Sequence, residues 1–133
     1  MQFVVPASDI QFDLPDDWWQ ISGMTGFRPL SNAYRFSSDP RWPTQVVPIT
    51  QIQPPVRDAG VVGLSGARTI DILKGFVADT PLPPAPVHTP PGAALDRYWV
   101  RDGYHRYYCS IAAGFSCLPV AVMPYFDIRD PNC

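Results

Sequence analysis

The spacing of apolar residues is most regular in the second half of the chain, where it predicts two helices. Between residues 66 and 78 the apolar positions recur every three or four residues and so share one face of a helix: Ile70, Leu73, Phe76 and Val77. A second helix is predicted over residues 104–113, with Gly114 placed to end it. These two helices are expected to be the main ones in the chain.

Short apolar runs predict the strands around these helices. They cover residues 45–52, 85–88, 96–101 and 118–123. Pro48 places the first run at a sheet edge or at a bulge, and the surrounding prolines place the run at 85–88 at an edge, with His88 on its solvent side. The predicted order in this region is therefore strand, helix, strand, strand, helix, strand.

The first 44 residues follow a less regular pattern. Residues 3–5 and 10–14 are predicted to pair as strands, and the Pro-Asp-Asp sequence after them starts a short helix that runs to Ile21. The rest of this region shows no period and is expected to be loop, with one strand near residues 33–36. Its large aromatic side chains are expected at the edge of the core, and a ligand pocket is the alternative place for them: Trp18, Trp19 and Trp42.

Composition adds that the chain is globular. Of 133 residues, 46% are hydrophobic and 17% are charged, which predicts one domain with a core of its own. We divide it into an N-terminal extension packed on the core (1–44), the core itself (45–124) and a tail (125–133). The 17 prolines predict many turns and extended segments. The formal net charge of −2 argues against a broad basic surface for nucleic acid.

Targeting signals and cysteine spacing suggest where the protein works. The sequence shows no signal peptide, and no apolar run approaches the roughly 20 residues that span a bilayer. Cys109, Cys117 and Cys133 have neither the spacing of a disulfide framework nor that of zinc ligands. We therefore expect a reduced, cytoplasmic protein without a structural metal and without a membrane partner.

The segment that follows the strand at 96–101 carries the chemistry. Asp102 and Gly103 form a turn, and His105 and Arg106 fall in the first turn of the next helix. The N-terminus of a helix attracts anions, glycine lets a ligand approach the backbone, and a guanidinium suits phosphate oxygens. The pattern indicates a phosphate-binding site.

Each of these residues also has a simpler interpretation. Arg106 would pair with Asp102 at a solvated helix start, and Asp102 would be a turn former or cap rather than a partner of ligand hydroxyls or of a metal-bound water. The three tyrosines of the helix either stack on a base or face the core: Tyr104, Tyr107 and Tyr108.

Together these elements resemble the ParB/sulfiredoxin superfamily. The resemblance rests on the order of elements, Arg57 after the first strand, the Pro-Leu-Pro-Pro-Ala-Pro-Val-His segment at 81–88, and Asp-Gly-Tyr-His-Arg followed by Ala-Gly and Leu-Pro-Val. It covers roughly residues 45–124 and implies an α+β fold, a small mixed sheet with two main helices. It also implies a nucleoside triphosphate site. Sulfiredoxins bind ATP and reduce a cysteine sulfinic acid, whereas ParB-type proteins bind CTP and load onto DNA.

The resemblance assigns roles residue by residue. Gly103, His105 and Arg106 match the phosphate-contacting turn, and Arg57 matches a further phosphate partner. Tyr104 stands where sulfiredoxins have their reactive cysteine, which argues against reductase chemistry. The helix at 66–78 departs from the sulfiredoxin register, although it offers polar groups near its start: Ser65, Arg68 and Thr69.

Three functions follow from these observations. The first is a free-standing, single-domain protein that binds a nucleotide, ATP or CTP, at residues 102–106 and 57. Mg²⁺ would assist it, and weak triphosphatase activity would be its only reaction. The second is a DNA-binding protein or nuclease of the ParB type. The third is a non-catalytic scaffold whose N-terminal extension binds a protein partner.

Overall fold

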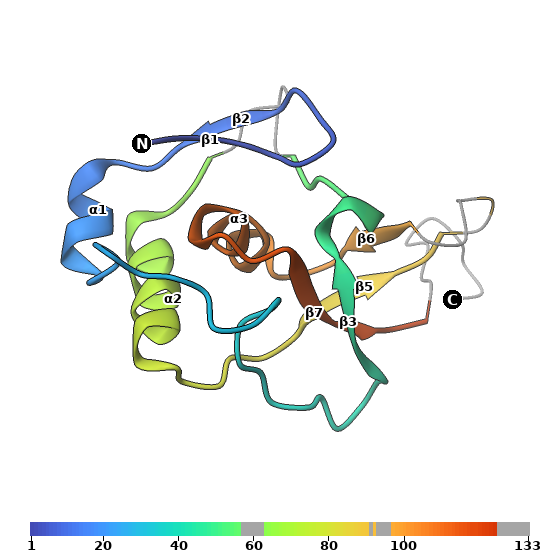
Figure 1. The fold of residues 1–133 in the computed structure, drawn as a ribbon. Helices are drawn as coiled ribbons and strands as arrows, with labels where there is room; N and C mark the ends of the chain where they lie inside the picture. Colours follow the sequence, from blue (N-terminus) through green and yellow to red (C-terminus); the bar gives the residue numbers. More distant parts are fainter. Residues whose placement is uncertain (57–62, 91, 93–96, 125–133) are drawn as a thin grey trace.

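The computed structural model describes residues 1–56, 63–90, 92 and 97–124. The N-terminal hairpin pairs β1 (Gln2–Val4) with β2 (Gln11–Asp13) in antiparallel register, and α1 (Asp16–Ile21) follows it (Figure 1). Phe12 lies opposite Phe3 in this hairpin and meets Tyr108 edge-on, with ring centroids 5.0 Å apart. The predicted strand pair and short helix are confirmed, and the hairpin packs on the core through an aromatic contact.

Five strands form one mixed sheet. Their order is β3-β7-β5-β6-β4, with parallel pairs β5–β7 and β4–β6 and antiparallel pairs β3–β7 and β5–β6. The strands are β3 (Thr44–Pro48), β4 (Ile52–Gln53), β5 (Ala85–His88), β6 (Tyr98–Val100) and β7 (Cys117–Val122). β3 and β4 lie at opposite edges, although only the 3-10 helix η1 (Ile49–Gln51) separates them in sequence. The sheet must therefore curl to bring its two edges close together.

The single strand predicted over 45–52 is wrong, because the chain leaves β3 at Pro48. Proline has no N–H for the sheet ladder, and Pro48 here caps η1 with φ −58° and ψ 139°. The next residue, Ile49, donates its N–H to Ser116 O at 3.0 Å. The chain then crosses to the other edge of the curled sheet, where Ile52 lies opposite Tyr98.

The edge position predicted for residues 85–88 is also wrong, since β5 is the central strand. Pro86 is tolerated there as an acceptor: its carbonyl oxygen receives the N–H of Arg101 at 2.8 Å. His88 is only 3% exposed and not on the solvent side, and its ring lies 6.1 Å from that of Trp99. Sheet partners on both sides thus overrode the proline signal.

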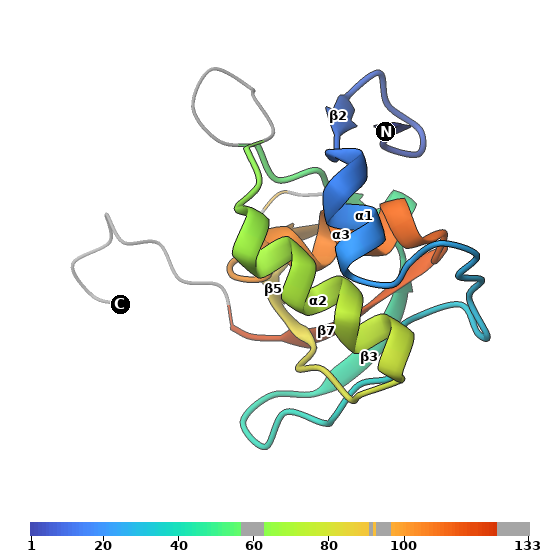
Figure 2. The same ribbon diagram turned by 90° about the vertical axis from the view of Figure 1, so that its left-hand side faces the viewer.

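The two main helices have the bounds that the sequence predicted, α2 (Gly66–Ala78) and α3 (Tyr104–Ala113). Figures 1 and 2 show α2 beside α3, with α1 lying against α2. Gly114 ends α3 in the left-handed conformation, with φ 95°. Tyr107 and Tyr108 are fully buried, so α3 is the central element of the core.

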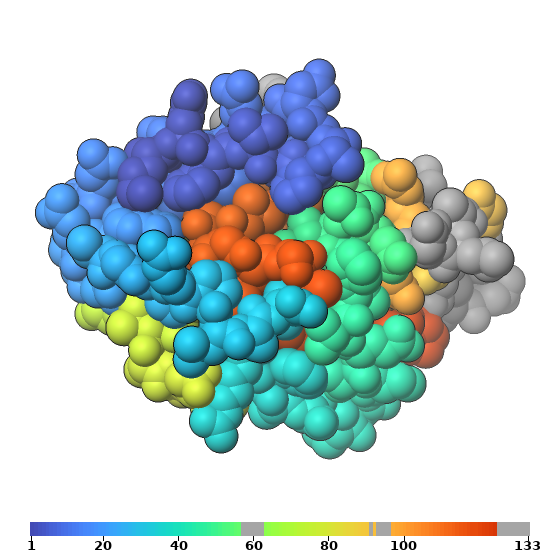
Figure 3. Space-filling model, viewed as in Figure 1, coloured from blue at the N-terminus to red at the C-terminus, as the bar shows by residue number. Residues whose placement is uncertain are grey.

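The N-terminal extension covers much of one face of the molecule. Figure 3 shows its blue and cyan residues above and below a strip of orange atoms from the α3 region. Trp18 and Trp19 pack against the core, as predicted. The strand expected at 33–36 is reduced to one isolated bridge, from Phe36 to Leu82. No helix in the described part of the chain is long and apolar enough to cross a membrane.

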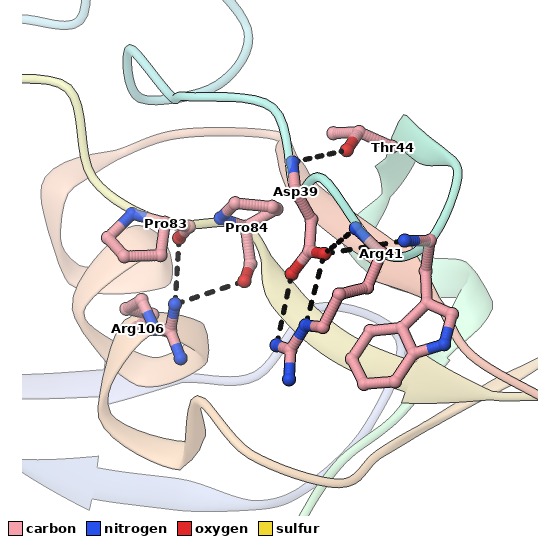
Figure 4. Close-up of polar contacts among 7 residues, drawn as sticks. Asp39, Arg41, Thr44, Pro83, Pro84 and Arg106 are labelled. Carbon is pink, nitrogen blue, oxygen red and sulfur yellow. Dashed lines mark hydrogen bonds and ion pairs between the residues drawn. The ribbon is translucent and has the colours of Figure 1, made fainter.

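A turn at residues 39–44 leads from the extension into β3. Asp39 accepts the N–H of Arg41 at 2.7 Å, and hydrogen bonds from that arginine hold the pKa of Asp39 below its ordinary value (Figure 4). The Arg41 guanidinium lies 4.1 Å above the centroid of the Trp42 ring. Trp42 is thus half-buried and lies beneath a cation. Unlike Trp18 and Trp19, it is not part of the core cluster.

Candidate functional site

The turn between β6 and α3 is built by backbone contacts with β5. Arg101 and Asp102 both donate their N–H groups to the carbonyl oxygen of Pro86, at 2.8 and 3.3 Å. Gly103 follows with φ 104°, and its N–H is accepted by the Asp102 carboxylate at 2.8 Å. A Cβ at Gly103 would lie 2.8 Å from the Cβ of Ala85, so glycine is required both by conformation and by space.

A cavity of about 420 Å³ opens at this turn. Its lining combines Pro55, which follows β4, with residues from α2, from the end of β6 and from the turn and start of α3: Arg68, Asp71, Ile72, Val100, Arg101, Asp102, Gly103, Tyr104, His105 and Arg106. Five of the six predicted site residues are among them, whereas Arg57 lies outside the described residues. The lining contains three arginines and two carboxylates, and this excess of positive charge favours an anionic ligand.

Two charged lining residues were not among the sequence candidates, Asp71 and Arg101. Asp71 lies three positions after Arg68 and therefore shares its side of α2, a signal present in the spacing. Arg101 directly precedes the Asp102–Gly103 turn. Its place at the cavity depends on the turn conformation, which the sequence pattern did not specify.

His105 connects the starts of the two main helices. Its side chain is 5% exposed, and Nε2 accepts the backbone N–H of Ser65 at 2.8 Å. Ser65 is the N-cap of α2, and its hydroxyl accepts the N–H of Arg68 at 3.5 Å. Nε2 therefore carries no proton in this arrangement. The imidazole fixes the α2 start beside the cavity, and a direct contact of His105 with a ligand stays a prediction.

Arg106 donates to backbone carbonyls rather than to a carboxylate. Its Nη1 lies 2.8 Å from Pro83 O and 3.1 Å from Pro84 O (Figure 4). Among the described residues it forms no ion pair, and Asp102 accepts the Gly103 N–H instead. The guanidinium charge at the cavity is therefore not neutralised by a carboxylate of the described chain.

The surroundings of Tyr104 and Cys109 argue against a reactive thiol at the start of α3. The Tyr104 hydroxyl accepts the N–H of Gly63 at 3.1 Å, and its ring meets that of Tyr108 at 5.0 Å. Cys109 is fully buried five residues farther along α3, and burial raises the pKa of its thiol to about 12. A thiol in such surroundings is protonated at neutral pH and is a poor nucleophile.

A larger cavity of about 760 Å³ lies between the extension and the C-terminal end of α2. Its charged lining groups are Arg28 and the pair of Arg35 and Asp79, whose charged atoms lie 3.7 Å apart. Aromatic rings line much of the remainder: Phe27, Tyr34, Phe36, Phe76 and Phe115. Its lining is thus more aromatic than that of the smaller cavity and includes two arginines instead of three. In the described part of the chain no three acidic, histidine or cysteine side chains cluster as metal ligands would.

Comparisons with known proteins place the fold. No family model matches the sequence, and neither does any curated protein. Among solved structures, the chain is similar to the C-terminally truncated chromosome-partitioning protein ParB from Caulobacter crescentus, crystallised in complex with CTP-gamma-S, with a TM-score of 0.51 and 21% sequence identity. The match covers 65% of this chain and 47% of the ParB chain, so this chain spans about half of the protein that it matches. The fold implied by the sequence is thus confirmed: the chain has a ParB/sulfiredoxin-like α+β fold.

Proposed function

We propose that the cavity at the start of α3 binds the phosphate groups of a nucleoside triphosphate. The observation that carries the proposal is the convergence of Gly103, Arg106 and Arg101 on one cavity at a helix N-terminus. The first N–H groups of a helix have no acceptor inside it and attract anions. The similar ParB structure, crystallised with CTP-gamma-S, supports a nucleotide as the ligand.

The other lining residues take complementary parts in this proposal. Arg68 and Arg101 are exposed and would meet the outer phosphates, whereas Ile72 and Val100 offer an apolar surface to the sugar or base. Mg²⁺ is commonly bound by one or two carboxylates together with substrate phosphates. The carboxylates that the described lining provides are those of Asp71 and Asp102, which fit that donor set.

We propose slow hydrolysis or none. Efficient hydrolysis needs a group that orients the attacking water next to the terminal phosphate. One oxygen of Asp102 already accepts the Gly103 N–H, and Asp71 is exposed on the surface of α2. Neither carboxylate is held by further protein contacts in a fixed direction toward the cavity among the described residues. Binding is therefore the main activity proposed, with ATP and CTP as the candidate ligands.

Calorimetry and thermal unfolding with CTP, ATP, GTP and inorganic tripolyphosphate, each with and without Mg²⁺, test the proposal. A ligand at 100 times its dissociation constant should stabilise the protein by about 2.7 kcal/mol. Arg106→Gln should weaken binding by roughly tenfold or more, because charge-assisted hydrogen bonds to phosphate are lost. Arg106 is replaced alone, since His105 also fixes the α2 start.

Arg28→Gln is the matched control, because Arg28 is an exposed arginine that lines the other cavity. It should leave affinity unchanged. The absence of a shift with every nucleotide at millimolar concentration would refute the proposal. Salt-dependent binding of DNA in place of nucleotides would instead support the ParB-type DNA-binding alternative.

A further inference from the structure

The carbonyl oxygen of Pro83 accepts hydrogen bonds from two distant parts of the chain. The hydroxyl of Tyr34 donates to it at 2.7 Å, and Nη1 of Arg106 donates to it at 2.8 Å. Nη1 also donates to Pro84 O at 3.1 Å, as Figure 4 shows. One peptide group thus joins a residue of the N-terminal extension to the arginine of the candidate phosphate site.

Further contacts hold both the Tyr34 side chain and the Pro83 carbonyl in place. Tyr34 is 3% exposed, and its ring stacks on that of Phe76 with centroids 5.5 Å apart. Beside it, Leu82 donates its N–H to Arg35 O at 3.0 Å and accepts the N–H of Ser37 at 3.1 Å. The extension therefore pairs with the residue that directly precedes the shared carbonyl and fixes the position of that carbonyl.

The two hydrogen bonds of Arg106 Nη1 also restrict the orientation of the whole guanidinium group. The group is planar and carries its donors in a rigid fork, so the placement of one nitrogen restricts the others. Nη2 lies beside the turn, since a Cβ on Gly103 would be 3.2 Å from it. A long side chain that is already ordered loses less conformational entropy when it binds a ligand.

We propose that Tyr34 is a positioning residue that holds Arg106, through the Pro83 carbonyl, ready for phosphate; this rests on the proposed function of the cavity. Burial raises the pKa of the Tyr34 phenol, and the Arg106 guanidinium opposes that rise. The phenol is accordingly protonated at neutral pH and acts as a donor. The N-terminal extension is, in this view, part of the phosphate site rather than an addition to the fold.

A double-mutant cycle with Tyr34→Phe and Arg106→Gln tests the proposal, with CTP and tripolyphosphate as probes in the presence of Mg²⁺. Tyr34→Phe removes only the hydroxyl and keeps the ring on Phe76. It should weaken binding roughly two- to tenfold, the worth of one net hydrogen bond. In the Arg106→Gln background it should cause no further loss.

Two further measurements separate positioning from a general effect on folding. Tyr107→Phe, in which the lost hydroxyl has no hydrogen-bond partner among the described residues, should bind like the wild type. The ¹⁵N NMR signal of the Arg106 side chain should show restricted rotation in the wild type and averaging in Tyr34→Phe, without any ligand.

The outcomes distinguish this proposal from the one on which it rests. Wild-type affinity in Tyr34→Phe, or an equal loss in both backgrounds, would overturn the positioning role and leave nucleotide binding standing. A wild-type protein that binds neither probe would overturn both. Loss of affinity only when Arg106 is present, together with averaging of its side-chain signal, supports the positioning role.

Discussion

The imidazole of His105 and the backbone N–H of Ser65 form a 2.8 Å hydrogen bond that joins the starts of α3 and α2. The two residues are 40 positions apart in the sequence. Arg68 and Asp71 follow Ser65 in the first turns of α2 and line the cavity at the start of α3. Together with the packing of α2 on α3, this contact therefore fixes the placement of both charges relative to Gly103.

Replacement of His105 by alanine should destabilise the fold. The Ser65 N–H would lose its acceptor in a partly buried place, and an unsatisfied polar group of this kind costs about 1–3 kcal/mol. Urea unfolding measures the loss. Ser65→Ala keeps the backbone N–H and removes only a weak cap contact of 3.5 Å, so it should cost about 1 kcal/mol or less. Equal stability of His105→Ala and the wild type would show that the contact contributes nothing.

Gly103→Ala should cost about 2 kcal/mol or more, because conformation and crowding act together. The residue has φ 104°, and an added Cβ would lie 2.8 Å from the Cβ of Ala85. Gly26→Ala is the matched control: it has φ 78°, but its Cβ would meet no described atom within 4 Å. Thermal unfolding of the pair isolates the crowding at the turn. Equal losses in both variants would mean that Ala85 yields without cost.

Local signals explain which elements the sequence predicted well. α2 and α3 begin and end at the expected residues because local signals act within a few positions: apolar periodicity, the Ser65 cap at the start of α2 and the left-handed Gly114 at the end of α3. The turn at Asp102 and Gly103 is local in the same way. Because residues 102–106 are consecutive in the sequence, this local turn alone brings all five of these candidates to one cavity.

Long-range pairing accounts for what the sequence pattern missed. Pro48 indicated an edge or a bulge, but the crossing from β3 to β4 depends on the curl of the whole sheet. The central place of β5 depends on partners on both sides. Likewise, Arg106 donates to carbonyls 22 and 23 positions away, and no spacing rule connects an arginine to a proline carbonyl.

Two neighbouring tyrosines of α3 should respond differently to loss of their hydroxyls. Both are fully buried, but the Tyr108 hydroxyl donates to Pro55 O, whereas the Tyr107 hydroxyl has no partner among the described residues. Tyr108→Phe should lose about 1 kcal/mol of stability, and Tyr107→Phe should be neutral or gain about 1 kcal/mol through relief of desolvation. Chemical denaturation of both variants decides the matter. A clear loss in Tyr107→Phe would reveal a partner for its hydroxyl.

Stability should fall in alkaline solution because buried acidic groups ionise more readily in the unfolded chain. Burial raises the pKa of Cys109 from 9.0 to about 12 and also raises that of Tyr107 and Tyr108 above the ordinary 10.0. Below its pKa in the unfolded chain, each group is protonated in both states and its contribution to the free energy of unfolding is complete. As the pH rises above that unfolded-state pKa, the contribution is lost at about 1.4 kcal/mol per pH unit for one group.

Unfolding in urea at pH 7.5, 9.5 and 10.5 checks this expectation. The free energy of unfolding should be highest at pH 7.5 and should fall more steeply above pH 10, where the tyrosines join Cys109. Cys109→Ala should be less stable than the wild type at pH 7.5. Its free energy of unfolding should nevertheless decline less between pH 7.5 and 9.5, because the variant lacks the buried thiol that ionises in this range in the unfolded chain. A free energy that stays constant to pH 10.5 would mean that these groups ionise equally well in the folded protein, against their burial in the core.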